Sequence, residues 1–360
     1  MALAGAGLWL WLDDSRVLLW TLTGLAGCIA LFALLAGWLL FSSGVDSEHA
    51  QGLEEYNRLQ EHEWQRWAQQ SVQVSGWHTI FSPQVLTPEQ ASDPVNSDIP
   101  LTLPPFPGYG WLAEEVIMAL LPELKAVIHR WPLEVLLPED AGDAQWRQFV
   151  ASWQQCGLLS TRLTAPAASV STYDITLHHW LDEPVNDRAR LVIVKHWTGT
   201  GEHTEGVVAL LVIPQAGEDD IPVRCSLHRP LSVAPGDESA AFLQFLHYQR
   251  LTTRMSGLWT DHKSAQLADR LVIAHSQRLK NDAPCQPERD QADAPASLPN
   301  RYCLPHWLGH AGPCADWFAV TLMMAMAEYS DGVQCGFFSS DSPSASWILN
   351  SVSAGAFVND

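Results

Sequence analysis

Basic residues are scarce in this sequence. It has 20 Lys and Arg residues against 40 Asp and Glu residues, which gives a net charge of -20 at pH 7. Such a surface repels phosphate groups, and this argues against nucleic acid as a partner and against adhesion to an anionic lipid surface. The acidic surface either serves solubility or receives a basic protein partner.

Motifs of several common enzyme classes are also missing. The sequence has no Gly-x-Ser-x-Gly turn of a serine hydrolase, no glycine-rich phosphate loop and no dinucleotide-binding glycine pattern. None of its seven cysteines forms a Cys-x-x-Cys pair. We expect reduced thiols, because a domain of about 300 residues buries enough core without disulfides. No cofactor is predicted.

Charged residues are absent from Val17 to Phe41. An apolar run of about 25 residues exceeds the thickness of a bilayer core, and Trp20 and Trp38 lie near its ends, where indole rings prefer to sit. The run lacks the basic start and the small-residue cleavage site of a signal peptide. The sequence therefore predicts a short tail over 1–16 and a retained transmembrane helix over 17–41.

The remainder divides into a stalk and two α/β halves. A polar helical pattern from Asp46 to about Gln70 and a proline-rich stretch from about 83 to 108 predict a helical stalk and linker over 42–107. Helical and strand patterns alternate after this point, which is typical of an α/β fold. We place the first half at 108–215 and the second at 216–360.

Three shorter patterns complete this interpretation. Tyr173 to Trp180 and Leu271 to His275 are strand-like, so alternation would send His178 and His179 to opposite faces of a sheet. Phe318 to Ala327 is apolar on nearly every helical face. Such a helix must lie between layers of the domain.

Two glycine motifs connect this pattern to a known fold. The turn Gly309–Gly312, with its Gly-His step at His310, opens the buried helix, and the segment Gly201–Gly206, which contains His203, precedes an apolar strand. These motifs resemble the thiolase-like fold of the β-ketoacyl synthases over roughly residues 108–360. The resemblance implies two sequential α/β halves whose central helices are buried between two sheets.

The nucleophile that this family needs is missing from its expected place. Ketosynthases use a cysteine at a helix start in the first half, where the helix dipole favours the thiolate, whereas Cys156 lies at a predicted helix end. Cys314 stands at a helix start, but in the second half, and Asp316 would oppose another negative charge on that turn. The resemblance thus implies an inactive scaffold without catalytic residues, in which His203, His310 and Cys314 form a vestigial site.

One short segment carries residue types that bind metals. Cys303, His306, His310 and Cys314 could supply four nitrogen and sulfur ligands to zinc. Their spacing matches no common zinc module, and two prolines separate them. We predict no metal site here and favour a buried turn.

A membrane segment followed by an acidic thiolase-like domain is similar to the lipase-adaptor family of type VI secretion systems. This resemblance implies a non-enzymatic adaptor that binds a phospholipase effector and loads it onto the spike protein. A loading role implies the bacterial inner membrane, with the soluble domain in the cytoplasm. The alternative is a divergent thiolase-like enzyme that transfers acyl groups at the membrane. The partner-binding surface and the oligomeric state are not predicted.

Overall fold

The computed structural model describes residues 15–90, 99–138, 140–165, 170–184, 186–214, 221–249, 255–282, 298–340 and 347–355. The chain forms two compact units, one ending at Trp64 and one beginning at Gln65. The expected tail over 1–16 lies almost wholly outside the described residues.

Helix α2 (Ser15–Ala68) makes up the described part of the first unit and continues into the second. Its stretch Leu22–Ala68 is long and apolar enough to cross a membrane, judged by length and composition alone. The most apolar window of this stretch has a mean hydropathy of 2.2 and no buried residue. A membrane span is therefore compatible with the structure, and the residues from Asp46 to Ala68, predicted as part of a stalk, are helical.

The second unit is built on one mixed sheet with the strand order β3-β2-β4-β5-β1-β6-β11-β10-β8-β9, and β7 pairs with β11. The pairs that β2 makes with β3 and β4, and those that β8 makes with β9 and β10, are parallel. The strands are β1 (Ser71–Phe81), β2 (Leu133–Leu136), β3 (Leu163–Thr164), β4 (Ala189–His196), β5 (Gly206–Ile213), β6 (Cys225–His228), β7 (Leu231–Val233), β8 (Met255–Thr260), β9 (Asn300–Cys303), β10 (Val333–Ser339) and β11 (Trp347–Ala354).

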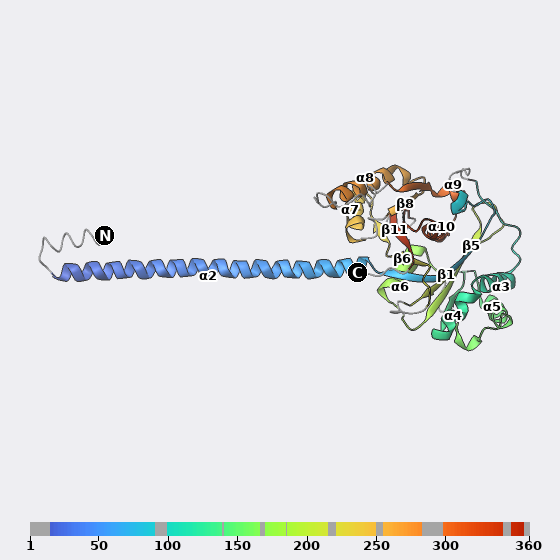
Figure 1. Ribbon diagram of the computed structural model, residues 1–360, viewed down its shortest axis with the longest axis horizontal. Coiled ribbons are helices and arrows are strands. Elements are labelled where there is room, and N and C mark those ends of the chain that lie inside the picture. The colour runs from blue at the N-terminus through green and yellow to red at the C-terminus, as the bar shows by residue number, and fades with distance from the viewer. Residues whose placement is uncertain are drawn as a thin grey trace, which may run out of the picture. The chain divides into compact units, whose positions relative to one another are not determined.

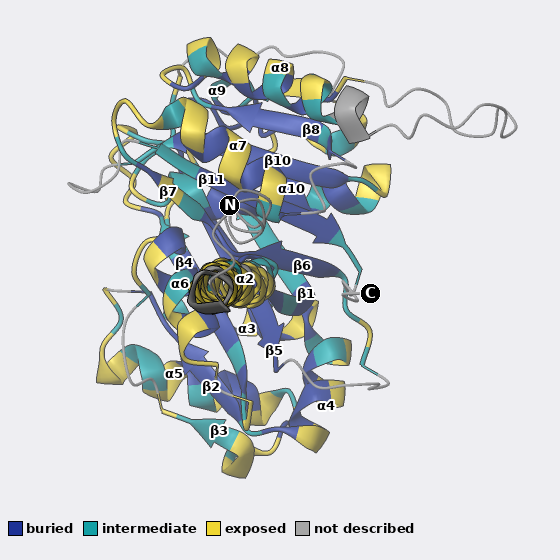
Figure 2. Cartoon of the chain, turned by 90° about the vertical axis from the view of Figure 1, so that its left-hand side faces the viewer, coloured by how far each residue is buried: buried dark blue, intermediate teal, exposed yellow. Residues whose placement is uncertain are grey.

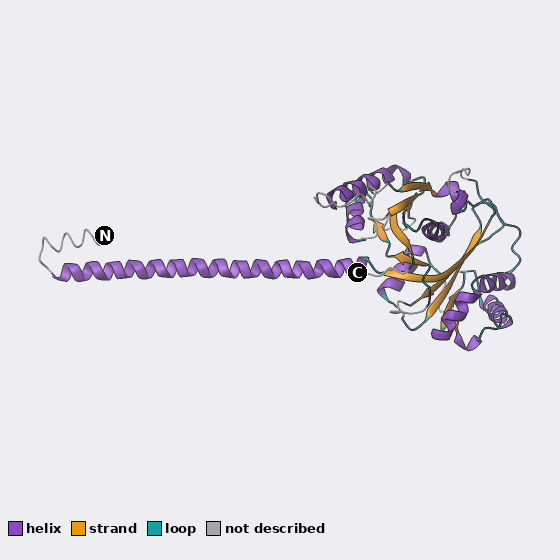
Figure 3. Ribbon diagram, viewed as in Figure 1, coloured by secondary structure: helices purple, strands orange, loops and turns teal. Residues whose placement is uncertain are grey.

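Helices cover this sheet on both faces (Figures 1 and 3). They are α3 (Tyr109–Ala119), α4 (Leu121–Arg130), α5 (Asp143–Gln155), α6 (Tyr173–Asp182), α7 (Glu238–Tyr248), α8 (Ala265–Asp282), α9 (Leu304–Leu308) and α10 (Ala315–Ser330), with 3-10 turns at Pro88–Gln90 and Ser160–Arg162. The α/β fold class is confirmed.

Three apolar clusters show how the layers are arranged. The middle cluster packs α6 and α10 against strands from both ends of the sheet. One outer cluster joins α3, α4 and α5 to the β2–β4–β5 end, and the other joins α7 and α8 to the β8–β10–β11 end. Figure 2 shows the strands mostly buried, with the outward faces of α7 and α8 exposed. The expected burial of a central helix between layers is thus present, although the two sheet halves are continuous through β1, β6 and β11.

Strand β1 corrects the predicted linker over 42–107. It lies in the middle of the sheet, antiparallel to both β5 and β6, with Val74 opposite Val212 and Val72 opposite Leu227. The domain therefore begins before residue 108. The strand is hard to recognise in the sequence because no turn motif marks its start. It begins three residues after a long helix and ends beside a proline-rich stretch.

Two segments predicted as strands are helical. Tyr173 to Trp180 belongs to α6, and Leu271 to His275 lies inside α8. In both, β-branched and aromatic residues mimic a strand over a short window, whereas the burial of one face repeats with helical spacing. His178 and His179 are consequently helix neighbours: His178 Nδ1 lies 3.4 Å from a guanidinium nitrogen of Arg229, and His179 lies 3.9 Å from Glu183.

Candidate functional site

Two connections meet at the start of α10: the β4–β5 connection over 197–205 and the α9–α10 connection over 309–314. The backbone N–H of Thr204 donates to the carbonyl oxygen of His310 at 2.7 Å. The hydroxyl of Thr204 donates to the carbonyl oxygen of Leu308 at 2.5 Å. Because Thr204 is fully buried, these bonds hold the two connections in one arrangement.

A buried carboxylate shapes the β4–β5 connection from within. Glu205 is 0% exposed, and its side chain accepts hydrogen bonds from the backbone N–H groups of Thr198 at 2.9 Å and of Gly199. Its other carboxylate oxygen accepts from the N–H of Leu103 at 3.0 Å. A carboxylate buried with three donors is well satisfied, so the loop that carries His203 has a defined shape.

Two glycines make the α9–α10 connection possible. Gly309 has φ of +67°, and a Cβ atom there would lie 2.1 Å from the carbonyl oxygen of Ile99. A Cβ atom on Gly312 would lie 2.7 Å from Cβ of His203. The Gly-His-x-Gly pattern is therefore a requirement for close approach of the backbone on both sides of His310.

Three imidazole rings gather at this junction. The rings of His203 and His310 are stacked, with centroids 5.1 Å apart and planes inclined by 20°, and the ring of His196 lies 5.8 Å from that of His203. His310 is exposed, whereas the other two are half-buried. Within the described residues, Nδ1 of His203 and Nε2 of His196 are buried and have no hydrogen-bond partner. Burial, and next the nearby His203, lower the pKa of His196, so this ring is neutral at pH 7.

Cys314 completes the group. It is the N-cap residue of α10 and is half-buried, and its Sγ lies 4.0 Å from the carbonyl oxygen of Lys195, which precedes His196 on β4. The Lys195 ammonium is held by Asp140 at 2.6 Å, which fixes the strand end that faces the thiol. The structure thus brings the three sequence-predicted residues His203, His310 and Cys314 to one junction, called the histidine–cysteine junction below, together with His196.

Asp316, on the first turn of α10, links the starts of the two middle helices. Its carboxylate accepts hydrogen bonds from the backbone N–H of Tyr173 at the start of α6, at 2.6 Å, and from that of Trp317, at 2.8 Å. Burial raises the pKa of Asp316 to about 6. The charge on the turn that carries Cys314 therefore depends on pH.

The residues considered as zinc ligands are not arranged for that role. Sγ of Cys303 lies 4.0 Å from Nδ1 of His262, a residue outside the considered set. Among the described residues, no group of three or more His, Cys, Asp and Glu side chains is placed to hold a metal ion.

Sequence reasoning gave no role to three residues of the junction: His196, Thr204 and Glu205. Thr204 and Glu205 lie within the Gly201–Gly206 motif. Their polar side chains directly precede an apolar strand, and this was the one pattern in the sequence that could have singled them out. Their partners Leu101, Leu308 and His310 are about 100 residues away in the chain, and no local pattern reveals such contacts.

No protein-family model matches this chain, and no curated protein matches it. Solved structures similar in fold include 3-oxoacyl-[acyl-carrier-protein] synthase III from Aquifex aeolicus, at 11% identity and a TM-score of 0.42, which covers 78% of this chain and 99% of that one. The tetronic acid condensing enzyme AbyA1 has 10% identity and a TM-score of 0.45 over 80% and 100% of the two chains. Cerulenin-bound OleA from Xanthomonas campestris has 9% identity and a TM-score of 0.42 over 80% and 97%.

The similar structures bear on the predicted fold and on the predicted lack of enzyme activity, but not on the predicted partners. The layered α/β domain resembles these thiolase-like structures in fold alone, and the likeness assigns no activity to this chain. The prediction that the domain is not an enzyme is contradicted, since the three similar structures named above are condensing enzymes. The comparisons give no support to the type VI secretion adaptor role. The lipase and spike partners and the membrane orientation remain predictions.

Proposed function

We propose that this protein is a divergent thiolase-like enzyme that transfers acyl groups, with Cys314 as the acyl acceptor and His203 and His310 as proton carriers. The observation that supports this most is the stacked histidine pair, with ring centroids 5.1 Å apart, on the same turn system as a thiol at a helix start. A helix N-terminus favours a thiolate, and neighbouring imidazoles accept its proton. His310 is exposed, so a substrate can reach the junction from solvent.

The chemistry would proceed in two balanced steps. The Cys314 thiol gives its proton to an imidazole nitrogen, and its sulfur attacks the carbonyl carbon of an acyl thioester. The bond from that carbon to the leaving sulfur breaks, and the leaving thiolate takes the proton, which gives an S-acyl cysteine and a free thiol. An acceptor nucleophile then attacks the acyl carbon, releases the Cys314 sulfur and returns a proton to it.

Helix α2 would hold this enzyme at a membrane. The supporting observation is the apolar stretch of α2, which has the length and composition of a span. We place the catalytic unit on the cytoplasmic side, because no disulfide joins the described cysteines and thiols persist in a reducing compartment. A reporter fused after Asp360 should be active in the cytoplasm. Activity of that fusion only in the periplasm would contradict the orientation and leave the chemistry untouched.

The test of the chemistry uses the full chain in non-ionic detergent micelles and a short-chain acyl thioester. We expect intact-mass spectrometry to show one added acyl group, peptide mapping to place it on Cys314, and a thiol-reactive dye to report the released thiol. Cys314→Ala should abolish the adduct. His203→Gln and His310→Gln should slow acylation by about 10²-fold or more, the usual contribution of a positioned acid or base.

Cys303→Ala is the matched control, because Cys303 is also half-buried and also begins a helix next to a histidine. Its removal should leave the acylation rate unchanged. Equal acylation of the wild type and the Cys314→Ala variant would overturn the proposal, and so would acylation that follows Cys303.

A further inference from the structure

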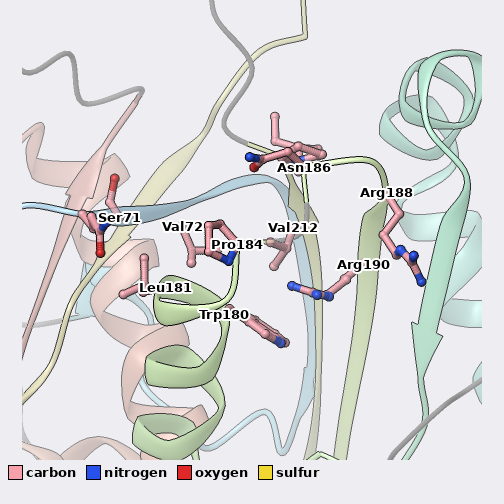
Figure 4. A pocket seen from close by; sticks show the side chains of 12 residues that line it. Ser71, Val72, Trp180, Leu181, Pro184, Asn186, Arg188, Arg190 and Val212 are labelled. Atoms are coloured by element: carbon pink, nitrogen blue, oxygen red, sulfur yellow. The ribbon is translucent and has the colours of Figure 1, made fainter. Parts of the chain in front are cut away.

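A cavity of about 80 Å³ lies between α6 and the sheet, away from the histidine–cysteine junction. Its apolar side is formed by Trp180 and Leu181 of α6, Val72 of β1 and Val212 of β5. Gln70, Asn186 and Arg190 contribute polar groups to its lining. Figure 4 shows Pro184 and Asn186 above this space and Trp180 below it.

Arg190 is the distinctive residue of the cavity. Its side chain is only 11% exposed and belongs to a row across the sheet, in which Arg190 pairs with Glu134 of β2 on one side and with Val212 of β5 on the other. Its Nε donates to Glu134 at 3.1 Å, and the guanidinium carbon lies 5.2 Å from the centre of the Trp180 ring. In Figure 4 the guanidinium reaches from its strand toward Trp180.

This arrangement leaves donors directed at the cavity. The ion pair with Glu134 uses Nε alone, and among the described residues the two terminal nitrogens of Arg190 have no hydrogen-bond partner. The side-chain oxygen of Gln70 accepts from Arg229 at 2.6 Å, which leaves the Gln70 amide N–H groups as donors. A guanidinium edge with two parallel donors matches a carboxylate.

The size and the apolar lining of the cavity determine which group the carboxylate can carry. A volume of about 80 Å³ holds roughly six water molecules at 10–15 Å³ each, which is the size of a ligand with about six non-hydrogen atoms. The two valines, Leu181 and the Trp180 ring offer this ligand no hydrogen bonds, so they favour a short alkyl chain.

We infer that this cavity is a binding site for a short-chain monocarboxylate, whose carboxylate takes the terminal nitrogens of Arg190 and whose alkyl chain lies against Trp180, Leu181 and the valines. The inference does not depend on the proposed acyl transfer. Glu134 already balances the charge of Arg190, and the site lies at the C-terminal turn of α6, where the helix dipole opposes an anion. Hydrogen bonds and apolar contact must therefore supply the affinity, and we expect a Kd of about 1–10 mM for butyrate.

The experiment uses the full chain in non-ionic detergent micelles and saturation-transfer NMR of butyrate. Butyrate should show saturable transfer, strongest on its methyl and methylene protons. Inorganic phosphate, which lacks the chain, and 1-butanol, which lacks the carboxylate, should each fail to displace it at equal concentration. Displacement by phosphate would mean a general anion site, displacement by butanol would mean an apolar hole, and either result would overturn the inference without any variant.

Three variants locate the site. Arg190→Gln should weaken butyrate binding by about 10-fold or more, because a charged hydrogen-bond partner is lost, and Val212→Phe should abolish it by filling the cavity. Arg188→Gln is the matched control: Arg188 also lines the cavity, but its side chain is 36% exposed, pairs with Asp187 at 3.1 Å and points away from Trp180 in Figure 4. Binding that survives Val212→Phe in a variant with an unchanged melting curve, or that falls equally with Arg188→Gln, would place butyrate elsewhere and refute the assignment.

Discussion

Helices α6 and α10 both pack in the middle layer, but they differ in composition and in what their first turns offer. Residues on every face of α10 are buried, whereas Ile175 on α6 is 57% exposed. The first turn of α10 carries Cys314, and that of α6 follows Ser171 and Thr172, which have hydroxyl groups. The two starts are bridged, because Asp316 accepts from the N–H of Tyr173 and the Trp317 indole donates to the Ser171 carbonyl at 3.1 Å. Helix α10 therefore contributes both the buried packing and the thiol, whereas the start of α6 contributes hydrogen-bond partners for the first turn of α10.

Loss of packing on α10 should have the largest effect. Phe318 is 0% exposed and its ring contacts that of Phe81 edge-on, with centroids 5.1 Å apart. Phe318→Ala should lower the free energy of unfolding by about 3–5 kcal/mol, because a cavity is left in a close-packed layer. Ile175→Ala on α6 should change it by less than about 0.5 kcal/mol. Urea unfolding of both variants checks this, and similar losses would remove the contrast between the helices.

The bridge at Asp316 should make stability depend on pH. Burial raises the pKa of Asp316 from 3.8 in the unfolded chain to about 6 in the folded one. The folded state therefore holds an extra proton between these values, so the contribution of this group is most favourable below pH 4 and is lost as the pH rises through 6. Relative to Asp316→Asn, the wild type should lose about 2 kcal/mol between pH 4 and pH 7.5. Unfolding free energies of the pair measured at several pH values give this difference, and a constant difference would refute the buried carboxylate.

The turn that leads into α10 should tolerate little change. Gly309→Ala puts a Cβ atom against the Ile99 carbonyl at positive φ, and we expect a loss of about 2 kcal/mol with slower thiol reactivity at Cys314, since the turn must shift. Gly157→Ala is the control, because Gly157 has φ of +74° but no atom within 4 Å of the added Cβ. That change should cost about 1 kcal/mol from backbone strain alone. Equal losses would show that the contact with Ile99 is easily relieved.

The start of α6 should be the least sensitive. Thr172 occupies the N-cap position, yet its side chain makes no capping hydrogen bond and instead donates to Asp174 at 2.7 Å. Thr172→Ala should therefore lower the unfolding free energy by only about 0.5 kcal/mol, at the bottom of the range for caps. A loss above about 1.5 kcal/mol in thermal melts would mean that the hydroxyl supports the α6 start directly.

The same two helices show what a sequence can reveal. The continuous apolar composition of Phe318–Ala327 permits only a buried helix, so α10 was predictable. In α6, the segment Tyr173–Leu177 mixes aromatic, β-branched and polar residues in the manner of a strand. This segment is helical because its buried face packs against both halves of the sheet. A short window does not contain that information.

The site divides in the same manner. The glycine motifs drew attention to His203, His310 and Cys314, because a tight turn leaves a local pattern in the sequence. The structure brings these residues to one junction, and their role stays a prediction. Glu205 and His196 were beyond reach, since their roles come from the donors of residues 103, 198 and 199 and from ring contacts across two connections. The cavity beside Arg190 was equally hidden, because it depends on pairing among β2, β4 and β5.

The central place of β1 has a consequence for biosynthesis. β1 is made early, directly after the apolar helix, but its two neighbours β5 and β6 follow more than 120 residues later. At roughly 5–20 residues per second, the ribosome needs about 8–30 s to complete them. During that time the innermost strand has both edges open, close to a segment that is a candidate for membrane insertion. Folding must therefore wait for non-local pairing, and the nascent chain is most prone to aggregation before residue 228 has left the ribosome.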